Sequence, residues 1–282
     1  MSPKKPLFDA CKARRICSFN ATSRLFGKLA DLPLPSPILK AAIAAYSKAF
    51  HVNLAESGRP PAEFSSFGDF FTRELREGSR PIAPLTDGLV CPSDGTLHNL
   101  GTIRDGLIPQ VKGNDYSIQD LIGESEAARR LENGTFATVY LSPANYHRVH
   151  SPIQGRITHC RYLPGALFSV HPLLVNNLKN VFVTNERIPI FIESPFGLVC
   201  VVMVAATIVG NITLTFSGLT TNRHSPQATE FYDTPVPVDA GTELGAFRLG
   251  STAVLLMEGR WQPHMLAEGM PVRMGTPFFR RG

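Results

Sequence analysis

The sequence lacks an apolar run long enough to cross a membrane as a helix. Its longest run, "LVCVVMVAATIVG" at residues 198–210, falls short of the roughly 18 to 20 residues that a spanning helix requires. The run is rich in β-branched residues, which favours one long buried strand or a pair of strands. We therefore expect a chain that does not span the membrane.

Cysteine is scarce and shows no pairing pattern. The five cysteines are Cys11, Cys17, Cys91, Cys160 and Cys200, and no two of them form a CxxC motif. An odd number of scattered cysteines is poor evidence for disulfides or a zinc site, and is typical of a reducing compartment. We expect structural or inert roles for all five.

Charge is distributed unevenly along the 282 residues, whose net charge is +5. Residues 1–50 hold nine lysines and arginines against two aspartates, a net charge of +7, so the remainder carries −2. A basic amino-terminal segment on a nearly neutral body suggests an anionic partner, either a membrane or nucleic acid. The segment lacks the interleaved aromatic residues of a base-stacking platform, which argues against nucleic acid.

The same basic segment shows the spacing of amphipathic helices. After Ser23, one apolar face is predicted, and a second helix is expected to have Ser36 as its cap and Pro37 at its first position. A third short helix is expected to end near Gly78. The apolar positions are Leu25, Phe26, Leu29 and Leu32, then Leu39, Ile43, Tyr46 and Phe50, then Phe67, Phe70, Phe71 and Leu75.

Such helices suit the plane of a membrane interface, but helices that merely cover a protein core show the same pattern. A cleavable transit peptide is a third interpretation, less favoured because the pattern continues to residue 50 without an evident processing site.

From about residue 88 the chain consists of short β-prone segments separated by Asp-Gly, Pro-Gly and Asn-Gly turns. The absence of βαβ alternation argues against a doubly wound parallel sheet. The sequence predicts a β-rich α+β fold, with a β-sandwich or partly closed barrel core fronted by amino-terminal amphipathic helices. We expect an amino-terminal membrane-associating segment at 1–80 and a β-rich catalytic domain at 81–282.

Three places concentrate reactive groups. Asp94 stands in "CPSDGT", His147 and His150 stand in "YLSPANYHRVHSP", and Ser251 follows Gly250 in "FRLGSTAVLLME". A glycine packs poorly in a strand centre, so a bend or a chemical role is expected there. An Asp that orients a His, a His that takes a proton and a Ser that attacks form the logic of nucleophilic activation.

Taken singly, each of these residues has an ordinary explanation. An Asp-Gly pair forms turns, two histidines can be unrelated surface residues, and HxxH without further ligands is a weak zinc signal. The GxSxG nucleophile elbow is absent, which argues against a hydrolase of that type. The residues alone therefore do not identify the bond that the serine attacks.

The motifs as a set resemble one known family, the phosphatidylserine decarboxylases, which are pyruvoyl-dependent enzymes that make phosphatidylethanolamine. The four catalytic positions match the family's pattern, and Ala205 replaces a usual glycine. The matching segments are "SRLFGKLADLPLP" (23–35), "FGDFFTRELREGSRPI" (67–82), "CPSDGT" (91–96), "VKGNDYSI" (111–118), "YLSPANYHRVHSPIQG" (140–155), "LPGALFSV" (163–170), "NER" (185–187), "AATIVGNI" (205–212) and "LGST" (249–252).

The resemblance implies that the chain cuts itself between Gly250 and Ser251 into a β chain, 1–250, and an α chain, 251–282. It implies a charge relay of Asp94, His150 and Ser251 for this cleavage. Ser251 would then become the covalent pyruvoyl cofactor, which forms a Schiff base with the substrate amine, and no metal is implied. By the same resemblance His147 assists decarboxylation.

The implied partners are phosphatidylserine in an anionic membrane and the two chains of the cut precursor, and a homo-oligomer stays open. The implied location is peripheral, on the cytoplasmic face of a bacterial plasma membrane, or on the mitochondrial inner membrane in a eukaryote. Two alternatives remain: a related pyruvoyl decarboxylase of another amine acid, and a β-sandwich binding module that never processes itself.

Overall fold

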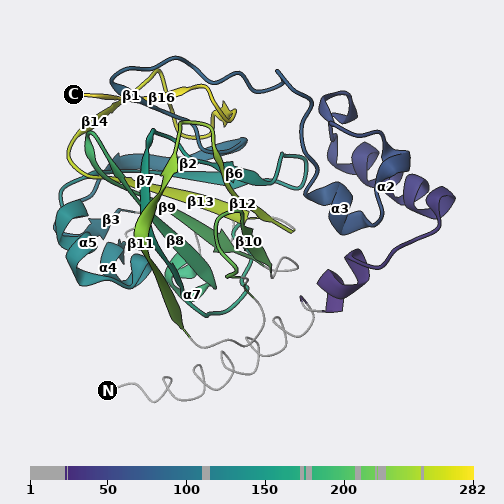
Figure 1. Cartoon of the computed structure of the whole chain (residues 1–282), viewed down its shortest axis with the longest axis horizontal. Helices are drawn as coiled ribbons and strands as arrows, with labels where there is room; N and C mark the ends of the chain where they lie inside the picture. Colours follow the sequence, from purple (N-terminus) through teal and green to yellow (C-terminus); the bar gives the residue numbers. More distant parts are fainter. Residues whose placement is uncertain are drawn as a thin grey trace.

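The computed structural model places an amino-terminal group of helices beside a larger body of strands (Figure 1). The structure describes residues 23, 25–109, 115–171, 175, 180–206, 211–219, 221, 227–248 and 251–282. The predicted cleavage residue Gly250, together with Cys11, Cys17 and all six lysines and arginines of the first 24 positions, lies outside them.

The described helices fall into an amino-terminal group and a group inserted among the strands. Residues 25–30 are also helical. The first group is α2 (Ser36–Phe50), the 3-10 turns η1 (Leu54–Glu56) and η2 (Pro61–Glu63), and α3 (Phe67–Phe71); the second is α4 (Ile118–Ile122), α5 (Ser125–Leu131) and α7 (Val181–Thr184).

Antiparallel pairing joins all the named strands of the described residues into four sheets. The largest, with eight strands, has the order β11 (Ala228–Val238), β7 (Gly155–Tyr162), β8 (Arg187–Ser194), β9 (Gly197–Ala205), β13 (Ser251–Met257), β5 (Thr135–Leu141), β2 (Gly95–Thr102), β15 (Pro271–Val272). The smaller sheets are β10 (Ile212–Leu214), β12 (Glu243–Phe247), β6 (Arg148–His150); β1 (Gly88–Val90), β16 (Pro277–Arg281), β14 (Trp261–Pro263); and β3 (Leu107–Ile108), β4 (Tyr116–Ser117).

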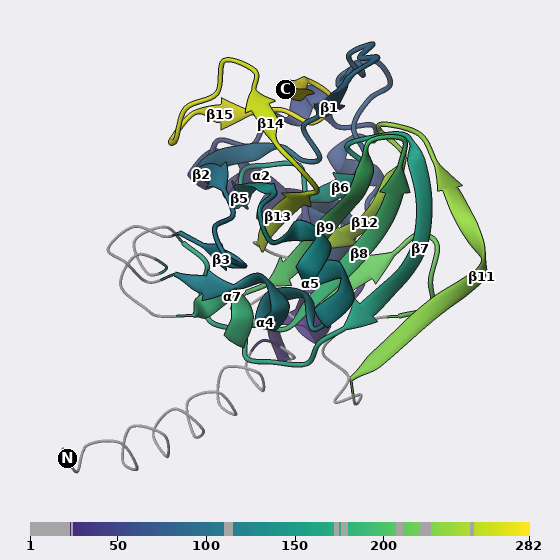
Figure 2. The same ribbon diagram turned by 90° about the vertical axis from the view of Figure 1, so that its left-hand side faces the viewer.

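The eight-stranded sheet is buried on both faces. On β13, Ala253 and Leu255 enter the cluster shared with the β10–β12–β6 sheet, whereas Val254 and Leu256 enter the cluster beneath α4, α5 and α7. This alternation follows from the two-residue period of a strand. Figure 2 shows α4, α5 and α7 grouped together near the sheet. The β-rich prediction is confirmed, but none of the described sheets closes into a barrel.

Of the two long apolar segments of the sequence, one forms a single strand and the other is shared between two strands. The long run at 198–210 forms the single strand β9 as far as Ala205, buried on both faces like other central strands. The segment at 247–258 is divided, because β12 ends at Phe247 and β13 begins at Ser251. The three described cysteines, Cys91, Cys160 and Cys200, are buried and free.

Helix α2 packs against the turns η1 and η2 and against α3 through one side. Leu39 and Ile43 are buried there, whereas Ile38 is 58% exposed. The predicted cap was wrong by one residue, because Pro35 precedes the helix without a side-chain cap bond and Ser36 is its first residue. None of the described helices is both long and apolar enough to cross a membrane.

The third predicted helix is shorter than expected. Ser66 caps α3 by accepting a hydrogen bond from the backbone N–H of Asp69 at 3.1 Å. The helix ends at Phe71, and Leu75 instead forms an isolated bridge with Ser57. Phe70 and Phe71 are buried, so this one turn points its aromatic rings inward.

Replacing Ile43 with alanine should lower the free energy of unfolding by about 2–5 kcal/mol, because a fully buried side chain is truncated. The matched control Ile38→Ala removes the same atoms from an exposed position and should change it by less than about 0.5 kcal/mol. Urea denaturation measures both. Equal effects of the two substitutions would show that α2 is not docked through Ile43.

Candidate active site

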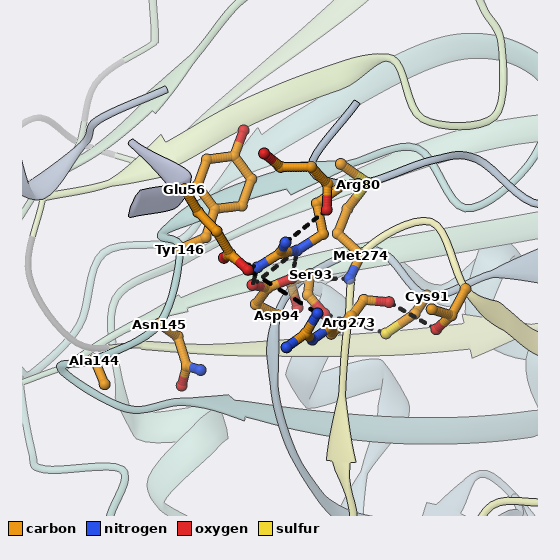
Figure 3. A network of polar contacts seen from close by, with 12 residues as sticks. Glu56, Arg80, Cys91, Ser93, Asp94, Ala144, Asn145, Tyr146, Arg273 and Met274 are labelled. Carbon is orange, nitrogen blue, oxygen red and sulfur yellow. Dashed lines mark hydrogen bonds and ion pairs between the residues drawn. The ribbon is translucent and has the colours of Figure 1, made fainter. Parts of the chain in front are cut away.

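Asp94 lies at the point where the chain enters β2, and it is 4% exposed. Its Oδ1 accepts hydrogen bonds from Arg80 Nε at 2.9 Å and from the Met274 backbone N–H at 2.9 Å, and its Oδ2 pairs with Arg80 Nη2 at 2.5 Å (Figure 3). The same Nη2 reaches Glu56 Oε2 at 2.8 Å. One buried carboxylate therefore joins the amino-terminal group, the β body and the carboxy-terminal segment.

These ion pairs shift the pKa values of Arg80 and Glu56. The hydrogen bond to Asp94 raises the pKa of Arg80, and the hydrogen bond from Arg80 lowers the pKa of Glu56. The guanidinium stays charged in any case, so the network holds a permanent cation between two carboxylates.

The glycine after Asp94 is required by packing rather than by a hairpin turn. A Cβ on Gly95 would lie 2.4 Å from the carbonyl oxygen of Tyr140 and 2.6 Å from Val139 Cγ1 on the neighbouring β5. The Asp-Gly pair therefore lets β2 begin in close contact with β5, with Asp94 directly before it.

His150 ends β6 and uses both ring nitrogens. Nδ1 lies 2.8 Å from the carbonyl oxygen of Gly241, and Nε2 lies 3.0 Å from the hydroxyl of Tyr146. A carbonyl only accepts, so Nδ1 carries the proton and Nε2 accepts from Tyr146. Burial lowers the pKa of His150, against an opposing contribution from the Gly241 hydrogen bond and smaller ones that include the charge of Asp94.

His147 lies just before β6 and is fully buried. Its ring stacks on Phe71 of α3, with centroids 4.1 Å apart, and its backbone carbonyl accepts a hydrogen bond from the N–H of Phe247 at 2.9 Å. Burial, aided by the charge of Arg73, lowers the pKa of His147 to about 3. The imidazole is therefore neutral near pH 7.

Ser251 is the first residue of β13 and is completely buried. It pairs with Leu141 of β5 on one side and with Ala205 of β9 on the other. Strand alternation places its side chain on the face of Ala253 and Leu255, toward the β10–β12–β6 sheet. Its Oγ has no hydrogen-bond partner, a property that it shares with the buried hydroxyls of Thr138 and Thr252.

A backbone hydrogen bond links His147 to the end of β12. The His147–Phe247 hydrogen bond joins the connection after β5 to the end of β12, four residues before Ser251 in the sequence. His150 lies farther along β6, opposite Glu243. Among the described residues, no hydrogen bond links Asp94 to His150 or His150 to Ser251.

Several residues at the site escaped the sequence reasoning. Arg80 binds Asp94, Tyr146 binds His150, and Phe71 stacks on His147. Phe71 and Arg80 stand in the segment 67–82 that carries the family resemblance, which was the available signal. In the described part of the chain, no group of three or more His, Cys, Asp or Glu side chains could hold a metal ion.

Comparison with known proteins gives a consistent result. Residues 67–280 match the family model of phosphatidylserine decarboxylase. A phosphatidylserine decarboxylase proenzyme of Anaeromyxobacter sp. (strain K) is 39% identical, covering 94% of this chain and 95% of the relative. Proenzymes of the same name from Shewanella halifaxensis (42% identical; 83% of this chain and 84% of the relative) and Bordetella avium (36%; 98% and 95%) are also similar.

The buried His147 should make the protein sensitive to acid. The folded state keeps its imidazole neutral down to a pKa of about 3, whereas the unfolded chain binds a proton near the ordinary value of 6.5. The free energy of unfolding should therefore fall as the pH drops below 6.5. In denaturation curves at a series of pH values, His147→Phe should lose stability less steeply over this range. The matched control His51→Asn, at an exposed histidine, should keep the wild-type slope, and a wild-type slope in His147→Phe would contradict the assignment.

Proposed function

Since the chain belongs to the phosphatidylserine decarboxylase family, we propose that it cuts itself before Ser251 and then converts phosphatidylserine to phosphatidylethanolamine and CO2. The observation that carries the proposal is the Ser251 hydroxyl, which is buried at the start of a central strand without a hydrogen-bond partner. A buried hydroxyl that no hydrogen bond holds can approach a neighbouring carbonyl, and this position fits a covalent group formed from the serine itself.

The cut begins with Ser251 Oγ attacking the carbonyl carbon of Gly250, so that a C–O bond forms and the peptide C–N bond breaks to give an ester. Loss of the Cα proton then expels the Gly250 carboxylate and leaves dehydroalanine at residue 251. Its imine tautomer takes up water and releases ammonia, which yields the pyruvoyl group. The hydroxyl is adjacent to its target, and such proximity can contribute about 7–11 kcal/mol.

We assign the proton transfers of the cut to His150 and Asp94. The charge of Asp94 favours the protonated imidazole of His150, which supports their pairing during the reaction. For Asp94 to hold the ring, Nδ1 must exchange the Gly241 carbonyl for the carboxylate, and Nε2 must turn from Tyr146 toward Ser251. Before this rearrangement, the hydrogen bond from Tyr146 holds the base, His150, in its resting orientation.

When formed, the pyruvoyl group supplies the electron sink for loss of CO2 from the substrate. His147 provides a neutral ring with one proton on a nitrogen, and we assign to it the proton transfer that accompanies loss of CO2. Phe71 covers its face at 4.1 Å and excludes water from it. The different surroundings of His147 and His150 support different roles for the two rings.

The two chains made by the cut are held together by the sheet. All seven residues of β13 pair with both β5 and β9, and β16 pairs with β1. The segment 251–282 therefore remains part of the fold after its covalent link is lost, and the new terminus stays at residue 251.

We further propose that the segment 1–80 attaches the body, 81–282, to the surface of an anionic membrane as a peripheral protein. Exposed apolar side chains occur with exposed lysines in the described part of this segment, as expected for an interfacial surface. These apolar residues are Leu25, Phe26, Leu29, Leu32, Leu34, Ile38 and Phe50, and the lysines are Lys28, Lys40 and Lys48.

Mass spectrometry of the purified protein should show the fragment 251–282 with a pyruvoyl group at its amino end. Ser251→Ala should stay intact and release no CO2 from phosphatidylserine. His150→Ala and Asp94→Asn should slow the cut at least tenfold, whereas His147→Ala should be cut but turn over slowly. Normal cleavage of His150→Ala together with an uncut His147→Ala would reverse the two assignments.

Binding to vesicles that contain phosphatidylserine should weaken as salt rises, because screening reduces the attraction of the basic segment. Ile38→Ala should reduce flotation with such vesicles severalfold, whereas Ile43→Ala, at the buried position, should affect it only through stability. Flotation that is insensitive both to salt and to Ile38→Ala would contradict the interfacial role.

A further inference from the structure

Arg73 is a buried cation whose hydrogen-bonding capacity is largely unused. It follows α3 and is 3% exposed, and neither its Nε nor its Nη1 has a hydrogen-bond partner. Its Nη2 lies 3.4 Å from the carbonyl oxygens of Ala144 and Asn145, at the long limit for such bonds. No ion pair to a carboxylate reaches it from the described residues.

The contrast with Arg187 shows that this is unusual within the same fold. Arg187 is also buried, yet Nε, Nη1 and Nη2 each donate to a backbone carbonyl at 2.6–2.8 Å. Arg80 is likewise satisfied, by two carboxylates. A guanidinium cannot shed its charge near neutral pH, and a buried charge without an ion-pair partner costs several kcal/mol. The Phe70 ring, whose centroid lies 5.2 Å from the guanidinium carbon of Arg73, offsets only part of this cost. Arg73 therefore has the free donors and the buried positive charge that are expected of an anion-binding residue.

Arg73 lies beside the segment that carries His147. Phe71, two residues earlier, stacks on His147, and the carbonyls near Nη2 belong to the connection that leads to His147. Figure 3 draws Ala144 and Asn145 in the same view as the Asp94 network, with no dashed line joining them to it. The charge of Arg73 contributes to the lowered pKa of His147, in agreement with this proximity.

We propose that Arg73 binds the phosphodiester of the lipid headgroup and thereby selects a phospholipid over a free amino acid. This inference rests on the proposed function. A phosphodiester presents two oxygens that match the Nε and Nη nitrogens of a guanidinium. Arg73 is buried, so the anion reaches it only when the neighbouring side chains move aside.

The substrate carries a second anion, the serine carboxylate, but that group is the less suitable partner. It leaves as CO2, so a guanidinium bound to it would stabilise the ground state and oppose the reaction. The phosphodiester is unchanged from substrate to product. A cation bound to it contributes to binding without raising the barrier.

Arg73→Met tests the proposal, because it keeps the length of the side chain and removes the charge. We expect KM for phosphatidylserine in neutral detergent micelles to rise about 10- to 100-fold, with kcat within about threefold and the cut before Ser251 intact. The melting temperature of the ligand-free protein should stay the same or rise, because an uncompensated charge is removed. Arg73→Lys should restore part of the affinity.

A purely structural role predicts the opposite pattern: a lower melting temperature and an unchanged KM in Arg73→Met would overturn the proposal. The matched control is Arg59→Gln. Arg59 lies over the Phe64 ring, 4.6 Å from its centroid, as Arg73 lies over Phe70, but Arg59 pairs with Asp69. This substitution should leave KM within about twofold.

Two soluble probes test separately which anion of the substrate Arg73 binds, without any turnover. Glycerophosphocholine has the phosphodiester as its only anionic group, and it should raise the melting temperature of the wild-type protein but not of Arg73→Met. N-acetylserine carries the carboxylate alone, and protection by this probe that is lost in Arg73→Met would refute the assigned anion. Stronger protection by inorganic phosphate than by glycerophosphocholine would indicate a free-phosphate site and contradict the lipid assignment. The measurements with these probes need no decarboxylation, so they can fail independently of the proposed function.

Discussion

The central position of β13 is the constraint on which the rest of the structure depends. Each of its seven residues pairs on both sides, with β5 and with β9. A strand in this position cannot leave without exposing two rows of backbone groups and the apolar clusters on both faces of the sheet. Ser251, as its first residue, is therefore held at a fixed point of the core.

A second constraint is the contact between the amino-terminal helices and the connection that carries His147. Phe71 stacks on the His147 ring, and the Tyr46 hydroxyl donates to the carbonyl of Pro143 at 2.9 Å. The ion pairs of Arg80 with Asp94 and Glu56 add a polar link from the amino-terminal group to the start of β2. The helices proposed to meet the membrane thus also form part of the environment of the reacting groups.

Much of the fold could be predicted from local pattern. The β-prone segments, the long strand at 198–205 and helix α2 were all visible, because alternation and helical spacing are properties of neighbouring residues. The predictions that were wrong concern the positions at which helices begin and end. The cap at Ser36 and the length of the third helix depend on how Pro35 and Leu75 meet the rest of the molecule, which periodicity does not encode.

The sequence by itself singled out Asp94, His147, His150 and Ser251 as the candidate reactive residues, because their motifs match a family over most of its length. Only the tertiary structure decided their surroundings. In the folded chain Asp94 forms an ion pair with Arg80, and the ring of His150 forms hydrogen bonds with Gly241 and Tyr146. The Ser251 hydroxyl has no hydrogen-bond partner. The physical reason is that these contacts join residues far apart in the chain. Their distances and burial follow from how the sheets and helices pack, which no local pattern specifies.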